Sequence, residues 1–250
     1  LSSIVLLCAL VLFIVLALLT YIQARVAQIE ARPSRPAWLM TMLWWLLAVA
    51  SKEDSVLLPA YALLIELTVL RFRTASAAHA RYLRGAYALF VLGGLMVYIF
   101  AIVPSYWRWE AYGGRDFSSY ERLLTQGRVL VMYLGQILLP LPERLPFYYD
   151  HIVVSRSLFA PATTLLALIL IAALIVGAWF LRLRRPLFAF GVLFFFAGHF
   201  VTSNVIGLEL AFEHRNHLPL IGALLALVDV VLLIVDRMRL RVGVVALFVA

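Results

Sequence analysis

Charged residues are scarce in this sequence, and lysine is almost absent from it. Only 14% of the 250 residues are charged, whereas 65% are hydrophobic; soluble domains carry about 25% charged and roughly 45–50% apolar residues. This composition excludes a water-soluble globular core and predicts a polytopic membrane protein. The single cysteine, Cys8, lies in an apolar run, which excludes a disulfide framework and a thiolate metal site.

Apolar runs reach both ends of the chain. The first begins at Ile4, close to Leu1, and the last continues to Ala250. The first run has no basic segment before it and no clear cleavage site, so it does not have the pattern of a signal peptide. We therefore expect the chain to be a fragment of a longer membrane protein.

Eight apolar stretches predict helices that cross a membrane, because about 20 apolar residues span its hydrocarbon core. These stretches are residues 4–22, 37–50, 56–70, 87–103, 159–181, 187–205, 218–235 and a truncated one from 242. We expect an all-α bundle of about eight spans that forms one transmembrane domain over residues 1–250.

The arginines are distributed unevenly between these stretches. Four connecting loops, at 23–36, 71–84, 182–185 and 236–241, hold 13 of the 21 basic residues and only two acids. Such loops stay in the cytoplasm. The intervening polar segments hold eight basic residues and nine acids, and we place them on the outer face. The net charge of +8 is therefore a topology signal, and we expect no nucleic-acid partner.

This alternation of sides keeps the whole of residues 104–158 on the outer face. The part at 123–141 is apolar and looks helical, but it cannot be a single span, because the chain must stay on the same side. Gln126, Arg128 and Gln136 suit a helix that lies on or dips into the outer leaflet. We therefore expect an outer-face loop with an interfacial helix.

Lys52 is the only lysine in the chain, and it lies beside Glu53 and Asp54 in a short turn between two apolar runs. Ionisable groups held so close to a bilayer are usually functional. Lysine offers a point charge to a phosphate, and the neighbouring acids can orient it or bind a metal. The alternatives are a solvated turn and an interfacial salt bridge.

A second outer cluster opens the helix predicted from 218. Glu213, His214, Arg215 and His217 precede Pro219, which suits a first helical turn. The N-terminus of a helix offers free N–H groups to an anion, and Arg215 can fork onto phosphate oxygens. The two histidines beside Glu213 also leave a divalent metal open, and a simple polar anchor at the interface is a further alternative.

Aromatic and charged residues alternate in the outer loop at 106–115. Trp107 and Trp109 offer flat faces to a sugar, and Tyr149 and Asp150 repeat the pattern later in the loop. The alternative is an aromatic belt at the membrane interface, which is common.

Four further polar residues lie within the apolar stretches. His199 and Asn204 lie towards the outer end of their stretch, where they can join an outer pocket. Glu66 and Asp229 lie near inner ends. The alternatives for these two acids are a pairing with arginine and a buried functional role; we expect them to snorkel towards the cytoplasm, and we leave them out of the site.

Two short motifs resemble elements of one family. Residues 51–53 (SKE), followed by an apolar run with Pro59, resemble an element of membrane glycosyltransferases with the GT-C fold. Residues 213–222 (EHRNHLPLIG) resemble the E-x-R-x-x-L-P-x-x-G element of the same group. Within that group, the motifs resemble those of the transmembrane and tetratricopeptide-repeat O-mannosyltransferases and their bacterial counterparts. Leu139-Pro140 with Tyr149-Asp150 is similar to a third element.

The resemblance implies a GT-C-like fold and the transfer of a sugar from a polyprenyl-phosphate donor to a protein or glycan acceptor. The reaction would take place on the outer, periplasmic face of a bacterial inner membrane. Lys52 matches the lysine that contacts the carrier phosphate in this fold, and Arg215 matches the arginine of the second motif. The family's catalytic acid lies in a loop upstream of Leu1, which leaves the base unassigned, with Glu53 and Asp150 as candidates.

We therefore expect two groups of site residues. Those expected to bind the lipid phosphate are Lys52, Arg215, His214 and His217. Those expected to bind the sugar or the acceptor are Trp107, Trp109, Tyr149 and Glu213. Membrane lipid is a further partner, and a divalent metal is the one cofactor left open. The alternatives are a transporter or flippase, a polymerase or ligase for lipid-linked saccharides, and a non-catalytic membrane scaffold.

Overall fold

The computed structural model describes all residues except 1, 112–114, 142–148, 150–151 and 250. For residues 2–4, 213 and 239–249 it describes the backbone without the side chains. Over this described part the chain is helical, without a strand. The elements are α1 (Ser2–Ile29), α2 (Arg35–Ser51), η1 (Glu53–Leu57), α3 (Leu58–Ile65), η2 (Glu66–Leu70), α4 (Ala77–Val97), η3 (Tyr98–Ile102), α5 (Val103–Tyr106), α6 (Ser119–Leu138), α7 (Thr163–Leu181), α8 (Pro186–Gly198), η5 (Glu213–Asn216) and α9 (His217–Val249).

Four helices in the described residues are long and apolar enough to cross a membrane. They cover Val5–Ile29, Ala77–Tyr106, Thr163–Leu181 and His214–Met238. Helix α8 is apolar but has only 13 residues, and α2 has 17. The chain is therefore an all-α protein of the transmembrane type.

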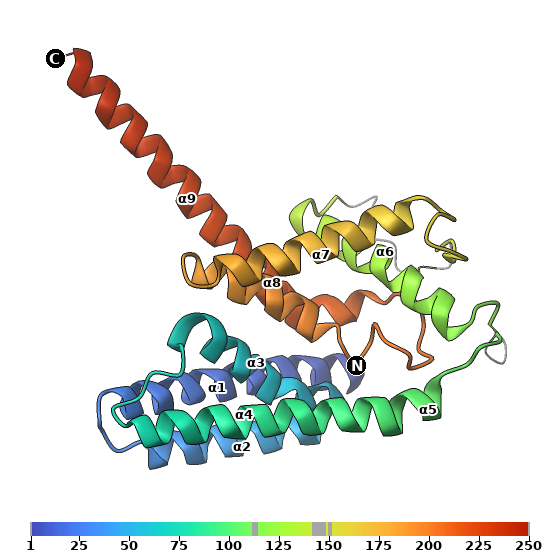
Figure 1. The fold of residues 1–250 in the computed structure, drawn as a ribbon, viewed down its shortest axis with the longest axis horizontal. Helices are drawn as coiled ribbons and strands as arrows, with labels where there is room; N and C mark the ends of the chain where they lie inside the picture. Colours follow the sequence, from blue (N-terminus) through green and yellow to red (C-terminus); the bar gives the residue numbers. More distant parts are fainter. Residues whose placement is uncertain (1, 112–114, 142–148, 150–151, 250) are drawn as a thin grey trace.

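The turn expected between the last two apolar stretches is absent. Helix α9 runs from His217 to Val249 without a break, through all three arginines of the 236–241 segment. No proline interrupts the segment, and arginine and leucine both favour helices, so nothing local stops the helix there. Figure 1 shows α9 extending away from the other helices towards the C-terminus.

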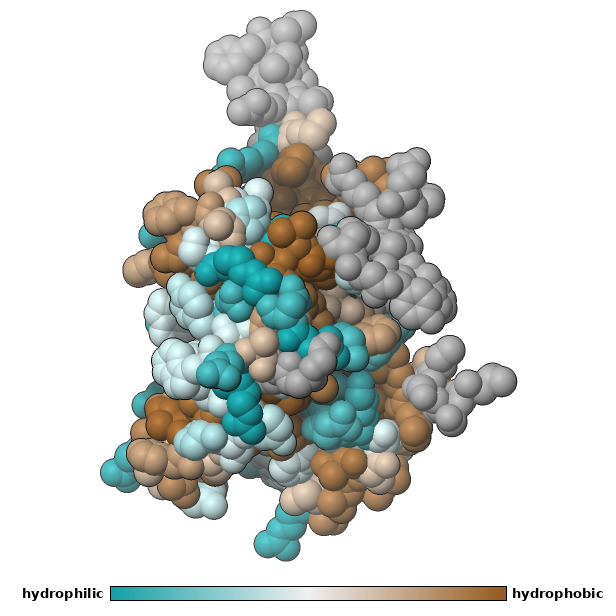
Figure 2. Space-filling view, turned by 90° about the vertical axis from the view of Figure 1, so that its right-hand side faces the viewer, coloured by the Kyte–Doolittle hydropathy of each residue, from teal (hydrophilic) through white to brown (hydrophobic). Residues whose placement is uncertain are grey.

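The remaining arginine-rich turns gather at one end of the bundle. The links α1–α2, η2–α4 and α7–α8, which contain residues 30–34, 71–76 and 182–185, lie together at the left of Figure 1. We call this the inner end. The α5–α6 connection and the start of α7 lie at the opposite, outer end. Figure 2 looks onto the outer end and shows hydrophilic residues gathered in the middle of that face, with apolar residues around them.

Helices α8 and α9 cross in close contact because both have glycine at the crossing point. A Cβ atom placed on Gly191 would lie 2.4 Å from the backbone oxygen of Gly222, and one on Gly222 would lie 2.6 Å from the oxygen of Gly191. Small residues allow helix backbones to approach closely in membrane proteins. This contact sets the direction in which α9 leaves the outer end.

An ion pair between α1 and η2 is fully buried near the inner end. Arg25 Nε lies 2.7 Å from Glu66 Oε1, and neither side chain is exposed. The hydroxyl of Tyr21 donates to the same oxygen at 2.8 Å, and the N–H of Phe72 donates to Oε2 at 3.0 Å. Glu66 therefore does not snorkel to water, because these donors satisfy its carboxylate inside the protein.

Asp229 also pairs with an arginine. Arg185 Nε lies 2.9 Å from Asp229 Oδ2, and Arg185 Nη2 donates to the backbone oxygen of the same aspartate at 2.6 Å. This pair joins the α7–α8 turn to α9. Both acids left out of the site thus hold helices together at the inner end.

Replacing Glu66 by alanine should destabilise the protein strongly, since it leaves the Arg25 guanidinium buried without its counter-charge. Breaking a buried pair costs about 3–5 kcal/mol. Thermal unfolding in detergent, followed by tryptophan fluorescence, should show a clear fall in Tm. The double variant Arg25→Met/Glu66→Met should recover most of that loss; an equal fall in both variants would contradict the assignment.

Candidate functional site

The link between α8 and α9, residues 199–212, contains no helix or strand. Its backbone N–H and C=O groups need partners, because unpaired polar groups are costly away from water. Arg122 of α6 provides several of them. Its fully buried guanidinium donates to the backbone oxygens of Asn204 at 2.9 Å, of Thr202 at 3.0 Å and of Leu208.

Two further side chains of α6 continue this contact along the link. Gln126 Nε2 donates to the oxygen of Leu210 at 2.8 Å. The Tyr133 hydroxyl accepts from the N–H of Phe212 at 2.7 Å and donates to its oxygen at 3.0 Å. The polar face of α6 thereby sets the path of the chain that leads into η5 and α9.

Helix α6 lies where the interfacial helix is expected at 123–141, with different bounds. It begins at Ser119, ends at Leu138 and packs beside α7. Gln126 and Gln136 are buried, at 2% and 6% exposure, so the expectation that they face a membrane interface is wrong. The reason is that both amides serve polar groups elsewhere in the protein, which a helix pattern by itself does not show.

The start of α6 is stabilised by a capping box. Ser118 Oγ accepts from the N–H of Glu121, and the Glu121 carboxylate accepts from the N–H of Ser118 at 2.8 Å. Arg156 Nη1 lies 3.0 Å from the same carboxylate. Burial alone would raise the pKa of Glu121, but the Ser118 N–H and the Arg156 charge outweigh it and lower that pKa. The ionised carboxylate thus joins α6 to the segment before α7.

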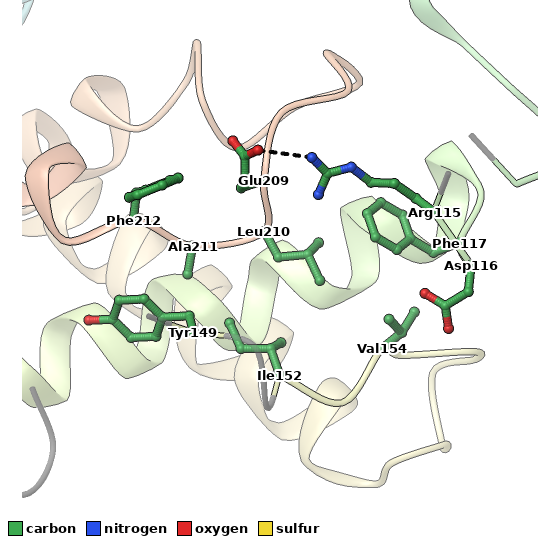
Figure 3. A pocket seen from close by; sticks show the side chains of 10 residues that line it. All are labelled: Arg115, Asp116, Phe117, Tyr149, Ile152, Val154, Glu209, Leu210, Ala211 and Phe212. Atoms are coloured by element: carbon green, nitrogen blue, oxygen red, sulfur yellow. Dashed lines mark hydrogen bonds and ion pairs between the residues drawn. The ribbon is translucent and has the colours of Figure 1, made fainter. Parts of the chain in front are cut away.

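A cavity of about 440 Å³ lies between the residues just before α6, the segment 149–154 and the end of the 199–212 link. Arg115 and Glu209 form a 3.0 Å ion pair on one side of it, and Tyr149, Ile152 and Val154 lie on the other side (Figure 3). The full lining is Arg115, Asp116, Phe117, Tyr149, Ile152, Val154, Glu209, Leu210, Ala211 and Phe212. A cavity with charge on one side and aromatic and aliphatic groups on the other suits an amphipathic ligand.

Glu209 connects this cavity to the predicted phosphate-binding arginine. Arg215 Nη1 donates to the backbone oxygen of Glu209 at 2.8 Å, and Arg215 Nη2 lies 3.9 Å from the Glu209 carboxylate. The backbone N–H of Glu209 itself, followed by Arg115 and Arg215, lowers the pKa of this carboxyl group. Glu209 therefore stays ionised and holds two arginines side by side.

The turn that carries Lys52 lies at the same end of the bundle, and we call Lys52, Asp54, Arg115, Glu209 and Arg215 the outer cluster. The Lys52 Nζ lies 3.1 Å from Asp54 Oδ2, and η1, which begins at the next residue, packs against α8. Leu58, the residue after η1, and Leu218, in the first turn of α9 after η5, belong to one buried apolar cluster. The structure thus brings the turn at residues 52–54 and the η5 segment to one place at the outer end.

The other predicted residues are placed less uniformly. Tyr149 lines the cavity and is buried, with its hydroxyl bonded to Gln136. His217 is exposed and its Nδ1 lies 2.9 Å from the backbone oxygen of His214. Glu53 is exposed and has no ion pair among the described side chains. The acid that faces the cluster is its neighbour, Asp54.

The two tryptophans lie apart from the cavity. Trp107 and Trp109 pack edge to face, with ring centroids 5.1 Å apart, and neither lines the cavity. Asp150 and the side chain of Glu213 lie outside the described residues. Within the described part of the chain, no group of three or more histidine, cysteine or acidic residues has the arrangement of a metal site.

Several residues of this site carry no distinctive sequence signal. Arg115 and Glu209 come from loops far apart in the chain, and only their shared outer placement links them beforehand. Arg122 carries a local signal, namely an arginine in a helix with a strongly apolar face. His199 was considered as a pocket residue; it is 1% exposed and packs between Tyr133 and Phe195, at ring distances of 5.2 and 4.8 Å.

Comparison of the chain with protein-family models, with curated proteins and with solved structures finds no match. The arguments for function therefore rest on the charges, cavities and contacts described above.

Replacing Arg122 by glutamine should loosen the 199–212 link. A hydrogen bond from a charged group contributes about 1.5–3 kcal/mol, so backbone amides of this link should exchange at least about tenfold faster. Hydrogen exchange with mass spectrometry on the detergent-solubilised protein measures this. Arg128→Gln is the matched control, because Arg128 lies on the same helix but donates to Val153. Unchanged exchange in the Arg122 variant, or equal acceleration in both, would refute the role given to Arg122.

Proposed function

We propose that this chain is the membrane part of a glycosyltransferase that moves a sugar from a polyprenyl-phosphate donor to a protein or glycan acceptor. The reaction would take place at the outer end of the bundle, facing the periplasm of a bacterial inner membrane. The observation that carries the proposal is the gathering of the Lys52–Asp54 pair and the Arg215–Glu209 contact at the outer end, where the helices that follow them share a buried apolar cluster.

The balance of charge in the outer cluster favours an anionic ligand. Arg115 and Arg215 share the single carboxylate of Glu209, and Lys52 pairs with Asp54. Side-chain exposure is 25% for Lys52 and 6% for Arg215, so an anion bound there would be partly shielded from water. Fixed cations in such a place stabilise the charge that develops on a departing phosphate.

An apolar slot within the helix bundle supports a lipid as the donor carrier. It has a volume of about 250 Å³ and lies between α6, α7, α8 and α9; its lining is Leu134, Leu138, Leu174, Phe188, Val192, Phe195, Phe196, Ala223, Ala226, Leu227 and Val230. Phe195 packs on His199, His199 stacks on Tyr133, and Tyr133 bonds Phe212 in the cavity wall. The slot and the polar cavity are thus separate pockets with a wall of packed aromatic side chains between them.

The cavity beside Glu209 is the proposed place for the sugar or the acceptor. Tyr149 and Phe212 offer aromatic faces there, and Arg115 and Asp116 offer polar groups. A carboxylate with a lowered pKa is a weak base, so we assign Glu209 to holding the arginines. Deprotonation of the acceptor hydroxyl stays with Glu53, Asp150 or an acid upstream of Leu1.

We further propose that α2, the segment 58–70 and α8 cross the membrane beside the four long helices, in a GT-C-like bundle. This makes seven crossings, because the eighth expected stretch is the end of α9. The charges of the cluster gather at one end of these helices. A transporter or flippase would instead need essential charges near the midplane and paired broken helices.

Lys52→Ala and Arg215→Ala should each weaken the binding of a polyprenyl monophosphate by at least about tenfold, or about 1.4 kcal/mol, because each removes a cation from the anion site. Binding to the full chain in nanodiscs can be measured by native mass spectrometry, and transfer from the sugar-loaded donor should fall similarly. Arg108→Gln is the control, since Arg108 is an exposed outer arginine whose guanidinium donates to the backbone oxygen of Trp107. Wild-type binding in both alanine variants would remove the proposed roles.

A further inference from the structure

Three arginines, Arg71, Arg182 and Arg184, lie at the inner end, on the side opposite the proposed reaction. Arg71 Nη2 donates to the backbone oxygen of Leu183 at 2.7 Å and so joins the end of η2 to the α7–α8 turn. Arg182 and Arg184 flank Leu183 in the sequence. Among the described side chains none of these three arginines forms an ion pair with a carboxylate, whereas the next one, Arg185, pairs with Asp229.

The position of Arg71 is determined by the buried network beneath it. Its backbone is left-handed, with φ of 58°, and its N–H donates to the oxygen of Glu66 at 2.8 Å. Left-handed backbone is unfavourable for arginine and persists only where the surroundings enforce it. The Nε–H of Arg71 is buried and has no hydrogen-bond partner within the described protein. A buried guanidinium donor without an acceptor indicates that a further group completes the site.

Arg182 is held in place by Trp179 of α7, one residue before the Leu183 oxygen that Arg71 contacts. Its Nη1 donates to the oxygen of Trp179 at 2.6 Å, and its guanidinium carbon lies 3.9 Å above the Trp179 ring. Arg184 is exposed. The site therefore combines two arginines in defined positions with a third that is free to close over a ligand.

Exposed apolar side chains surround these charges. Trp179 is 43% exposed, Phe180 76%, Leu183 55% and Val69 47%. A free anion in water gains nothing from such a surface, but a lipid does, because its phosphate can meet the arginines while its chains cover the apolar groups. Basic side chains at a membrane surface attract acidic lipids by about 1 kcal/mol each, and arginine matches the geometry of phosphate oxygens.

We propose that Arg71, Arg182 and Arg184 form a binding site for the headgroup phosphate of an acidic phospholipid of the inner leaflet. Its acyl chains would lie along the exposed face of α7 at Trp179 and Phe180. The bound lipid would contact the accessible part of Arg71 and join the η2–α4 link to the α7–α8 turn. This inference is independent of the proposed transferase activity, since it concerns the opposite end of the bundle.

Native mass spectrometry of the detergent-solubilised full chain, incubated with phosphatidylglycerol or phosphatidylcholine, tests the site. The unsubstituted protein should retain phosphatidylglycerol at least about fivefold better, and Arg182→Gln/Arg184→Gln should remove that preference. The two substitutions leave Arg71 untouched, and an unchanged Tm in detergent without added lipid would show that the variant is folded.

Arg35→Gln is the matched control, because Arg35 is an exposed arginine of the inner end in the α1–α2 region. It should keep the preference for phosphatidylglycerol. The proposal is overturned if the unsubstituted protein shows no preference, if the control loses it equally, or if millimolar inorganic phosphate displaces the lipid, which would indicate a site for free anions.

Discussion

The structure depends on how α6 satisfies the backbone of an irregular link between two apolar helices. Residues 199–212 lack regular hydrogen bonds of their own, and such a chain is stable beside membrane-type helices only where the protein supplies partners. Arg122, Gln126 and Tyr133 supply them in sequence along one face of α6. That face is consequently polar and buried, although α6 lies among apolar neighbours.

The proposed site follows from this constraint. Once the link is held, Glu209 is presented between Arg115 and Arg215, and η5 opens α9 beside the turn that carries Lys52. The close approach of Gly191 and Gly222 brings α9 against α8, which η1 also contacts. The result is a polar outer end above an apolar slot, a division that suits an amphipathic anion better than a soluble ligand.

The charged groups of this protein serve two different purposes, to join helices and to bind ligands. The Arg25–Glu66 pair is enclosed and saturated by Tyr21 and Phe72, so it joins helices and offers nothing to a ligand. In the outer cluster, two arginines share the carboxylate of Glu209. At the inner end, the Nε–H of Arg71 has no acceptor among the described residues. Unsatisfied positive charge, rather than charge as such, distinguishes the two proposed binding sites from the structural pair.

The sequence by itself determined the all-α membrane class and the gathering of arginine-rich turns at one end, because hydropathy and charge act through local composition. It also singled out Lys52 and Arg215 as unusual. Only the tertiary structure decided that Asp54 rather than Glu53 faces the cluster, that Glu209 joins Arg115 to Arg215, that Gln126 and Gln136 turn inward, and that α9 continues past Val235. These features depend on which distant backbone groups need a partner, and that demand exists only after the helices have packed.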